Sequence, residues 1–472
     1  MAQKIDMLNG GLFKKIIIFT IPIMLQGLLQ SVYNAADLAI VGQFTLDPTP
    51  LDGINEAGTS AVAAVGSTTS IFNVLVGLFM GLSVGVDVVS SYQYGRGEHK
   101  NLKKLIDTAV VLAPILGIVV GVIGFFVSGP VLVVMKTPEG NGVLQSATIY
   151  LQILMLGIPF SMIFNFISAV LRTAGETNKP FIFLSISGVL NVILNVVFCK
   201  GFNLSVVGVA IATVISQVLS ATLIFIYLVR RKDIFTFSFR SISFSFGMLW
   251  KIIKIGLPAG LQSAAFSLSN TFLQTGVNSF DNPDVNAGST AVGTVEGLMW
   301  VTLTSFQNAT TTFMSQNLSV GNLSRARKVL RYTLLMTASL GLVIGMGAFL
   351  LKEPIMSIFI KDNPSALQYS FERLMFTFPP YFLAGIMGVM PGAIRAFGCS
   401  LPPSLITIIG TCGIRILWVY TVFQSYHQLN VLYLVHPITW VLTNIALFTT
   451  YFIVLHLYKK KQKTENQELA VA

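Results

Sequence analysis

KIIIFTIPIMLQGLLQSVYNAADLAIVGQF, residues 15–44, decides the fold, because a second copy follows at residues 251–280 as KIIKIGLPAGLQSAAFSLSNTFLQTGVNSF. The two stretches align without gaps at an offset of 236 and share ten of thirty residues. Chance gives two apolar helices of this length roughly two or three identities. The chain therefore consists of two homologous halves.

Shorter motifs recur in the same order after each copy. Gly97 is followed six positions later by the basic residue Lys103, and Gly321 is followed at the same distance by Arg327. A second set of three residues also recurs, as Arg172, Gly175 and Pro180 in the first half and Arg395, Gly398 and Pro403 in the second. The order of these motifs indicates that a whole half has been duplicated, and not only one helix.

The composition predicts an all-α membrane protein. Of the 472 residues, 53% are hydrophobic and only 10% are charged, whereas soluble proteins carry roughly 25% charged residues. Apolar runs of about 20 residues, enough to span a bilayer, recur from end to end. The twelve expected spans are residues 16–43, 60–91, 105–128, 146–170, 181–199, 206–229, 252–280, 290–315, 332–351, 366–394, 403–422 and 432–457.

Six spans in each half make the two repeats parallel, since an even number returns the chain to the starting side of the membrane. We expect a bundle at residues 1–230, a cytoplasmic linker at 231–251 and a second bundle at 252–472. Parallel repeats are related by an axis along the membrane normal, and the substrate path is expected between them.

The basic residues predict the orientation. With the N-terminus in the cytoplasm, inner segments hold 24 of the 30 Lys and Arg residues, and outer loops hold only four. The four are Lys136, Lys200, Lys352 and Lys361. Cytoplasmic loops carry such an excess, so we expect both termini inside a cell inner membrane. The net charge of +11 thus reflects topology and not nucleic-acid binding.

Motifs of catalysis and of bound cofactors are absent from the sequence. No phosphate-cradling GxxxxGK[ST] sequence, zinc-protease HExxH or hydrolase GxSxG occurs. The three cysteines lie far apart, and the histidines at positions 99, 427, 436 and 456 lie in loops or near expected helix ends. We expect no enzyme activity, cofactor or metal site, so transport must be driven by an ion or substrate gradient.

Asp37 is the clearest candidate for coupling to such a gradient. It lies in the first span, and no basic residue lies within twenty positions on either side. A charge inside the membrane costs at least about 2.5–3.5 kcal/mol and usually faces a cavity. Asp37 could hold a proton or bind sodium with neighbouring oxygens, or it could lie at a helix end and reach the outer headgroups.

The sequence leaves the roles of the other polar residues inside the spans open. Glu296 is a second carboxylate, nearer to a span end and expected to matter less than Asp37, and Arg415 needs a partner that the sequence does not name. Asn191 and Asn195 are four residues apart, so they share a helix face. They could coordinate an ion or hydrogen-bond another helix. Glu372 with Arg373 is expected to anchor at the interface, and Asp87 and Asp107 to pair with local basic residues.

Four motifs in sequence order resemble the MATE family, the multidrug and toxic compound extrusion transporters, over almost the whole chain. They are the first-span stretch that begins PIMLQG, GVAIATVISQ at 208–217, RTAGETNKP at 172–180 and MSQNLSVGNLSRARK at 314–328. The resemblance implies two bundles in a V that alternate between inward and outward openings. It also implies efflux of cationic or amphipathic compounds against protons or sodium.

The resemblance further implies an ion site in the first bundle. The positions in this chain that match the family's site are Asp37, Asn191, Asn195 and Thr213. Some members have an acid where Asn195 stands, and this departure favours protons over sodium at Asp37. We expect the substrate path to include polar residues of both halves, namely Asn34, Gln26, Gln262, Asn270, Glu296 and Arg415.

Two other functions compete with drug export. A flippase of lipid-linked oligosaccharides, from the same superfamily, would need several basic residues inside the spans, and only Arg415 and Arg373 qualify in the sequence. A non-transporting receptor or scaffold would not explain the duplication or Asp37. We therefore expect a monomeric antiporter in the lipid bilayer that carries small molecules.

Overall fold

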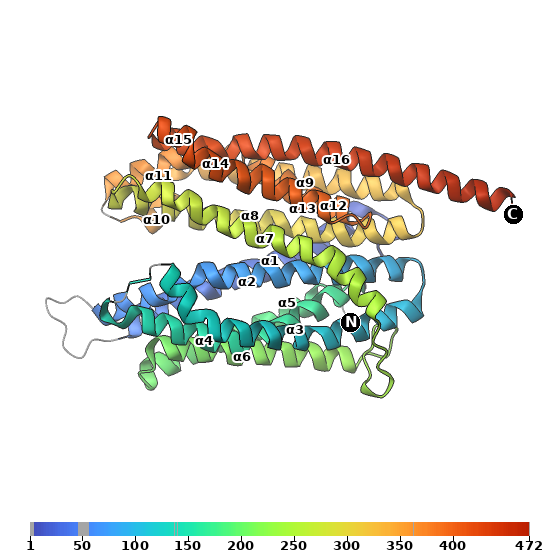
Figure 1. Cartoon of the computed structure of the whole chain (residues 1–472), viewed down its shortest axis with the longest axis horizontal. Helices are drawn as coiled ribbons and strands as arrows, with labels where there is room; N and C mark the ends of the chain where they lie inside the picture. The colour runs from blue at the N-terminus through green and yellow to red at the C-terminus, as the bar shows by residue number, and fades with distance from the viewer. Residues whose placement is uncertain (1–3, 46–55, 136, 139, 362, 472) are drawn as a thin grey trace. The chain divides into compact units, whose positions relative to one another are not determined.

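The structure is a computed structural model that describes residues 4–45, 56–135, 137–138, 140–361 and 363–471. Helices account for nearly all regular structure in these residues, and no strand occurs among them. Figure 1 shows the helices running side by side along one direction. The all-α fold is the one that composition predicted.

Twelve helical segments have the length of a membrane span. The first six are α1 (Leu12–Phe44), α2 (Glu56–Gly95), α3 (His99–Val134), α4 (Val143–Thr173), α5 (Asn178–Val196) continued by a π-helix at Val197–Gly201, and α6 (Ser205–Val229). The second six are α7 (Phe246–Asn278), α8 (Pro283–Ser319), α9 (Leu323–Leu350), α11 (Pro364–Thr377) with α12 (Tyr381–Arg395), α13 (Leu401–Thr407) with a π-helix at Ile408–Gly413, α14 (Ile414–Tyr420) and α15 (Val422–Ser425), and α16 (Leu429–Val471).

Most of these segments are also apolar enough to cross a membrane. Nine helices of the described residues meet that condition, and the bent pair α11–α12 makes a tenth. The other two, α7 and α8, have 33 and 37 residues and exceed the roughly 20 that a bilayer requires. The count agrees with the twelve spans expected from the sequence.

One expected span is broken. Residues 366–394 were predicted as a single helix, but α11 ends at Thr377, α12 begins at Tyr381, and the two helices meet at 52°. Pro379 and Pro380 lie in the break, and a proline lacks the N–H that would continue the helix. The short helix α10 (Lys352–Phe359) was not predicted.

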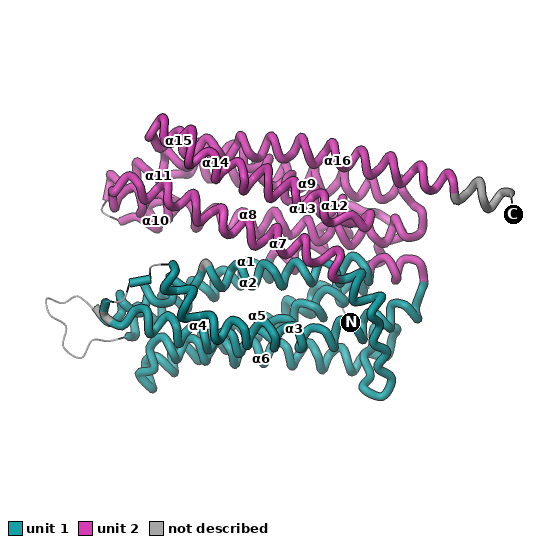
Figure 2. The backbone as a smooth tube through the Cα atoms, viewed as in Figure 1, with its two compact units in different colours: residues 1–5, 25–90, 98–252 teal, residues 6–24, 91–97, 253–472 magenta. Residues whose placement is uncertain are grey.

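Two compact units make up the chain. Figure 2 shows unit 1, which comprises residues 1–5, 25–90 and 98–252, and unit 2, which comprises residues 6–24, 91–97 and 253–472. Residues of the expected linker pack on α3 in unit 1, because the Ser243 amide donates to Asp107 at 3.1 Å and Lys103 donates to the Thr236 carbonyl at 3.0 Å. The division into halves 1–230 and 252–472 with linker 231–251 stays a prediction.

Turns at matching repeat positions adopt the same backbone conformation. Gly97 and Gly321 have φ values of +69° and +74°, and Gly175 and Gly398 have +77° and +84°. Glycine tolerates this left-handed region because it has no Cβ. Each glycine amide also donates to the carbonyl three residues earlier, at 2.8 to 3.1 Å. The duplication inferred from sequence is therefore visible in the geometry of the helix connections.

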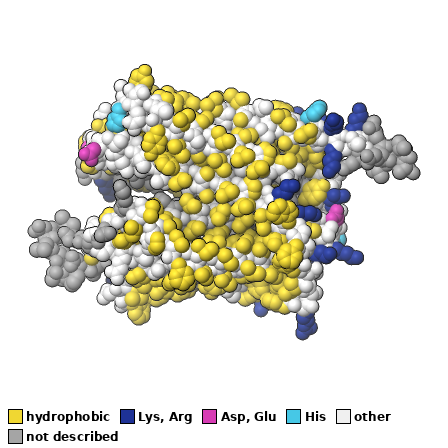
Figure 3. Space-filling view, in the orientation of Figure 1, with side chains coloured by type: hydrophobic (Ala, Val, Ile, Leu, Met, Phe, Trp, Pro, Cys, Tyr) yellow, Lys and Arg dark blue, Asp and Glu magenta, His cyan; other side chains and the backbone are white. Residues whose placement is uncertain are grey.

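The visible surface is mainly apolar. In Figure 3 hydrophobic side chains cover most of the face shown, and Lys and Arg side chains gather near one end, where α16 continues toward the C-terminus. Large apolar side chains such as Phe126 and Val343 are 73% and 68% exposed. Such exposure suits a surface that faces lipid. Lys136, one of the four basic residues expected outside, is not among the described residues.

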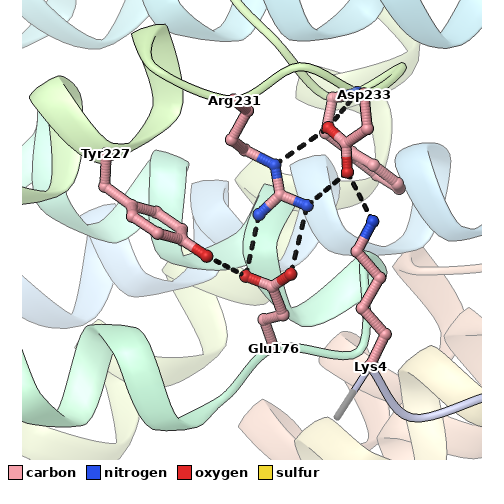
Figure 4. Close-up of polar contacts among 6 residues, drawn as sticks. Lys4, Glu176, Tyr227, Arg231 and Asp233 are labelled. Atoms are coloured by element: carbon pink, nitrogen blue, oxygen red, sulfur yellow. Dashed lines mark hydrogen bonds and ion pairs between the residues drawn. The ribbon is translucent and has the colours of Figure 1, made fainter. Parts of the chain in front are cut away.

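A network of ion pairs ties several segments of unit 1 together (Figure 4). Arg231 donates to Glu176 at 2.8 and 3.2 Å and to Asp233 at 2.6 and 3.0 Å. Tyr227 donates to Glu176 at 2.6 Å, and Lys4 pairs with Asp233 at 2.5 Å. The network thereby joins the N-terminal segment, the connection between α4 and α5, and the end of α6.

Charge also stabilises the ionised form of Asp233 in this network. Burial alone would raise its pKa, but hydrogen bonds and positive charges from Arg231 and Lys4 lower the pKa below its usual range. A carboxyl with a lowered folded-state pKa stabilises the fold above its unfolded pKa of about 3.9 and loses that contribution as the pH falls below it. The network is therefore fully effective at neutral and mildly acidic pH.

We expect Arg231→Gln to lower the free energy of unfolding by about 1–3 kcal/mol, between the values of exposed and of buried ion pairs. The loss should be the same at pH 8 and pH 5, and should shrink only below about pH 4. Thermal unfolding of the purified protein measures it. Arg230→Gln is the matched control, because Arg230 is exposed. Equal effects of the two substitutions would contradict this account of the network.

Candidate functional site

A close approach of α1 and α5 sets up the first polar cluster. A Cβ at Gly188 would lie 1.9 Å from the ring of Tyr33, so only glycine lets the two helices approach this closely. Tyr33 and Asp37 are four residues apart, and Gly188, Asn191 and Asn195 follow a spacing of three and four. Residues at these spacings lie on one helix face. The contact therefore brings Asp37 opposite the two asparagines.

Asp37 forms a hydrogen-bonded cluster with the three residues named by the family resemblance. Asn195 Nδ2 donates to Asp37 Oδ1 at 2.5 Å and to Asn191 Oδ1 at 3.3 Å. Thr213 Oγ1 lies 3.5 Å from Asp37 Oδ2, and Asn191 Nδ2 donates to Thr213 at 3.3 Å. These four residues, which we call the Asp37 cluster, come from α1, α5 and α6 within unit 1.

The Asp37 carboxylate is buried without a positive partner. Its exposed fraction is 7%, and that of Asn195 is 0%. Within the described ranges no Lys, Arg or His forms an ion pair with it. The interpretation of Asp37 as a residue that reaches the headgroups is therefore wrong.

Two candidates for the substrate path on α1 lie outside this cluster. Asn34 is exposed and Gln26 is half-buried. Neither hydrogen-bonds to the Asp37 cluster in the part of the chain that the structure describes. Their place on a substrate path stays a prediction.

Glu296 pairs with Arg373, which corrects the interfacial role expected for Arg373. Arg373 Nη2 and Nε donate to the two Glu296 oxygens at 2.6 and 3.3 Å, and Nη1 donates to Ser289 Oγ at 2.6 Å. The Arg373 side chain is only 10% exposed and that of Glu296 only 14%. The charge of Glu296 is therefore balanced inside unit 2. Sequence could not show this pair, because its members are 77 positions apart.

Arg415 finds its partners in Asn270 and His436. Its Nη1 donates to Asn270 Oδ1 at 3.1 Å, and its Nη2 lies 3.3 Å from His436 Nδ1. Arg415 is 2% exposed and His436 is 5% exposed. His436 is thus buried inside unit 2, although its place near an expected helix end suggested a solvated or interfacial side chain. In the sequence, an arginine alone in a predicted span indicates that a buried polar partner exists.

Gln262 contacts a third buried arginine. Arg395 was counted among the cytoplasmic loop residues, but it ends α12, is 2% exposed, and donates to Gln262 Oε1 and to Ser404 Oγ. Its counterpart in the first half, Arg172, instead pairs with the buried Asp87 at 3.2 Å. Asp107 pairs with Lys103 at 2.7 Å. Local pairing is confirmed for Asp107, whereas Asp87 pairs with a residue 85 positions away. The sequence also underestimated the basic residues inside unit 2.

Metal binding finds no support in the described residues. No group of three or more His, Cys, Asp or Glu side chains among them could hold a metal ion. Cys199, Cys399 and Cys412 are free thiols. The chemistry that the arrangement offers is hydrogen bonding and charge, and not bond cleavage.

A family model named MatE matches two stretches of the chain, residues 22–197 and 258–421. The chain belongs to the MatE family. The two matches begin 236 positions apart, which is the offset of the repeat found in the sequence. Proteins of the MatE family are membrane transporters, so the chain is a transporter and not an enzyme.

Curated relatives match the chain over nearly its whole length. The probable multidrug resistance protein YoeA of Bacillus subtilis is 26% identical over 463 residues, which are 96% of each chain. The probable multidrug resistance protein NorM of Thermotoga maritima is 27% identical over 429 residues, which are 89% of this chain and 87% of the relative. The match to MATE proteins expected from the motifs is thereby confirmed.

Solved structures share the fold. An outward-facing multidrug resistance MATE family transporter of the MOP superfamily superposes with a TM-score of 0.86 at 20% identity, over 98% of this chain and 99% of that chain. A MOP superfamily transporter from Pyrococcus furiosus, described by the reverse polarity of its binding pocket, superposes with a TM-score of 0.83 at 19% identity, over 98% of both chains. The arrangement of twelve helices in two repeats is that of these transporters.

The Glu296–Arg373 pair makes a prediction about stability. Glu296→Gln should lower the free energy of unfolding by about 3–5 kcal/mol, because it leaves a buried guanidinium without its carboxylate. Arg373→Gln should do the same, and the double substitution should cost much less than the sum of the two. Thermal unfolding of the four proteins measures the coupling, with Glu372→Gln as the control beside the pair. Additive losses would contradict the pairing.

Proposed function

We propose that the chain exports cationic or amphipathic small molecules in exchange for protons, and that Asp37 couples the two fluxes. The observation that carries the proposal is the burial of Asp37 among neutral hydrogen-bonding partners, with no ion-pair partner in the described residues. The names of YoeA and NorM, both multidrug resistance proteins, support the substrate class. Exchange must use a gradient, because the sequence contains no nucleotide-binding motif.

A buried carboxylate that lacks a positively charged partner is suited to binding a cation and carrying it. Desolvation disfavours the charged form, so Asp37 is stabilised by taking up a proton or another small cation. When the cation leaves, the negative charge must be stabilised by hydrogen bonds or by a positively charged substrate. Competition of a proton and a cationic substrate for one carboxylate would give obligatory exchange, provided that the two conformations of the carrier differ in their affinity for each.

Asn195 favours a proton over sodium. An amide has both a donor and an acceptor, so rotation of this side chain lets it donate to ionised Asp37 or accept from protonated Asp37. In the structure Nδ2 faces Asp37, while the buried Oδ1 of Asn195 has no hydrogen-bond partner in the described residues. Sodium would need several oxygen ligands, and the cluster supplies only one carboxylate. The sodium alternative is separated from the proton by experiment.

Asp37→Asn should abolish gradient-driven export and leave a folded protein in the membrane. Asparagine has nearly the same shape as aspartate. The substitution removes an unpaired buried charge, which does not destabilise the bundle. A neutral residue cannot take up and release a proton, so the variant should lose the ion exchange that drives export. Dye efflux from cells with matched protein levels measures the loss, and Asn34→Asp, on the same helix, tests whether a displaced acid can substitute. Export by Asp37→Asn at the normal rate would overturn the coupling role.

Reconstituted protein separates the two coupling ions. In liposomes, a proton gradient alone should drive substrate uptake, and a sodium gradient at equal pH on both sides should not. If sodium drives transport and Asp37→Asn abolishes it, Asp37 is still the coupling residue, but the coupling ion is sodium and not the proton. Transport driven by neither gradient would contradict antiport itself.

We also propose that the membrane orientation follows the basic residues, with both termini in the cytoplasm of the cell inner membrane. Excess Lys and Arg mark cytoplasmic loops. A cysteine introduced at Asp284, near the start of α8, should react with an impermeant thiol reagent in intact cells, and one at Asn322, at the start of α9, should react only after lysis. A background without Cys199, Cys399 and Cys412 gives the control. The reverse pattern would overturn the orientation.

A further inference from the structure

The interior of unit 2 carries more positive than negative charge. Its buried polar centre contains Arg373 and Arg415 but a single carboxylate, Glu296. Arg373 uses all three of its nitrogens on Glu296 and Ser289. Arg415 makes no ion pair with a carboxylate among the residues that the structure describes. Arg415 is therefore left without a carboxylate partner in this centre, as is the buried Arg395 elsewhere in unit 2.

The partners of Arg415 leave two buried donors without an acceptor. A guanidinium only donates, so His436 Nδ1 must accept from Arg415 Nη2, and the ring proton then sits on Nε2. His436 Nε2 and Arg415 Nε are both buried and lack a hydrogen-bond partner in the described part of the chain. Unpaired buried donors and charges are costly. An anion is the kind of group that accepts hydrogen bonds from two such donors.

The same three spans hold the polar cluster in each repeat. In the first half, the first, fifth and sixth spans supply Asp37, Asn195 and Thr213. In the second half, the seventh, eleventh and twelfth spans supply Asn270, Arg415 and His436. We call Asn270, Arg415 and His436 the Arg415 cluster. Asn270 occupies the repeat position of Asn34, at the offset of 236. The duplicated framework thus places a negative charge in one unit and a positive charge in the other.

Local structure supports a binding role for the Arg415 cluster. A π-helix, Ile408–Gly413, ends two residues before Arg415, and such segments occur frequently at functional sites. The guanidinium lies over the Phe266 ring at 5.5 Å, and Phe266 stacks on Trp300 with centroids 5.0 Å apart. Asn270 is exposed, so the cluster reaches the surface of unit 2. An aromatic wall beside a charged group suits an organic ligand.

We propose that the Arg415 cluster binds a carboxylate of the transported compound. One carboxylate balances the charge of Arg415, and its two oxygens match the guanidinium edge and neighbouring donors. A substrate bound in this way carries an acid in addition to any basic amine. The part of the inference that concerns transport rests on the proposed export function, whereas the binding part stands by itself.

A pair of probes that differ in one charge tests the inference. Norfloxacin, a fluoroquinolone with a carboxylate and a basic amine, is compared with its methyl ester by fluorescence titration of the purified full chain in detergent. The wild-type protein should bind the acid at least about tenfold more tightly than the ester, since hydrogen bonds to charged groups contribute on this scale. Arg415→Gln should remove the preference, and Arg415→Lys, which keeps the charge, should restore part of it.

Controls separate this site from other effects. Arg395→Gln removes another buried arginine of unit 2 and should keep the preference for the acid. The titration uses no gradient, so failure of the export proposal and failure of this one give different results. Equal affinity of wild type for acid and ester, or a preference that survives in Arg415→Gln, would overturn the inference. Stabilisation by acetate without a preference for the drug acid would also overturn it, since a free anion would then be the ligand.

Discussion

A charge inside a bilayer must be balanced, and this constraint shapes both units of the protein. Several charges are balanced within the chain, as in Asp87 with Arg172 and Glu296 with Arg373. Among the described residues Asp37, Arg395 and Arg415 have neutral polar partners instead of an opposite charge, and they are 7%, 2% and 2% exposed. An unbalanced buried charge is tolerated where a ligand supplies the counter-charge during function. Asp37 and Arg415 are the two unbalanced charges for which we propose such a ligand.

Duplication explains why the two places resemble each other in architecture but not in charge. Each repeat supplies the same backbone features, including the glycine turns with positive φ at corresponding positions. Side chains on that backbone have diverged: Arg172 has Asp87, whereas its counterpart Arg395 donates to neutral partners such as Gln262 and Ser404. Identity is retained at the glycine turns and at several positions of the first span of each repeat, whereas the buried charges have diverged.

The sequence predicted the features that depend on one segment at a time. The spans follow from local hydrophobicity, and the grouping of Asn191 with Asn195 follows from helical spacing. Pairs such as Glu296 with Arg373, and Arg415 with His436, depend on how helices rotate and pack laterally, which local pattern does not encode. Asp37 was joined to its partners only through the resemblance to a family. The closeness of α1 and α5 at Gly188, which creates that cluster, is visible only in three dimensions.

The two unbalanced charges would serve different purposes in a transport cycle. An arginine remains charged at any physiological pH, so Arg415 would attract an anionic group equally in every conformation that exposes it. Such uniform binding selects a substrate but does not couple its movement to a gradient. An aspartate in a neutral environment can change its charge with its surroundings, so Asp37 would bind a cation differently in the two conformations. On these grounds we propose that Arg415 selects the molecule that is carried, while Asp37 sets the direction in which the gradient drives it.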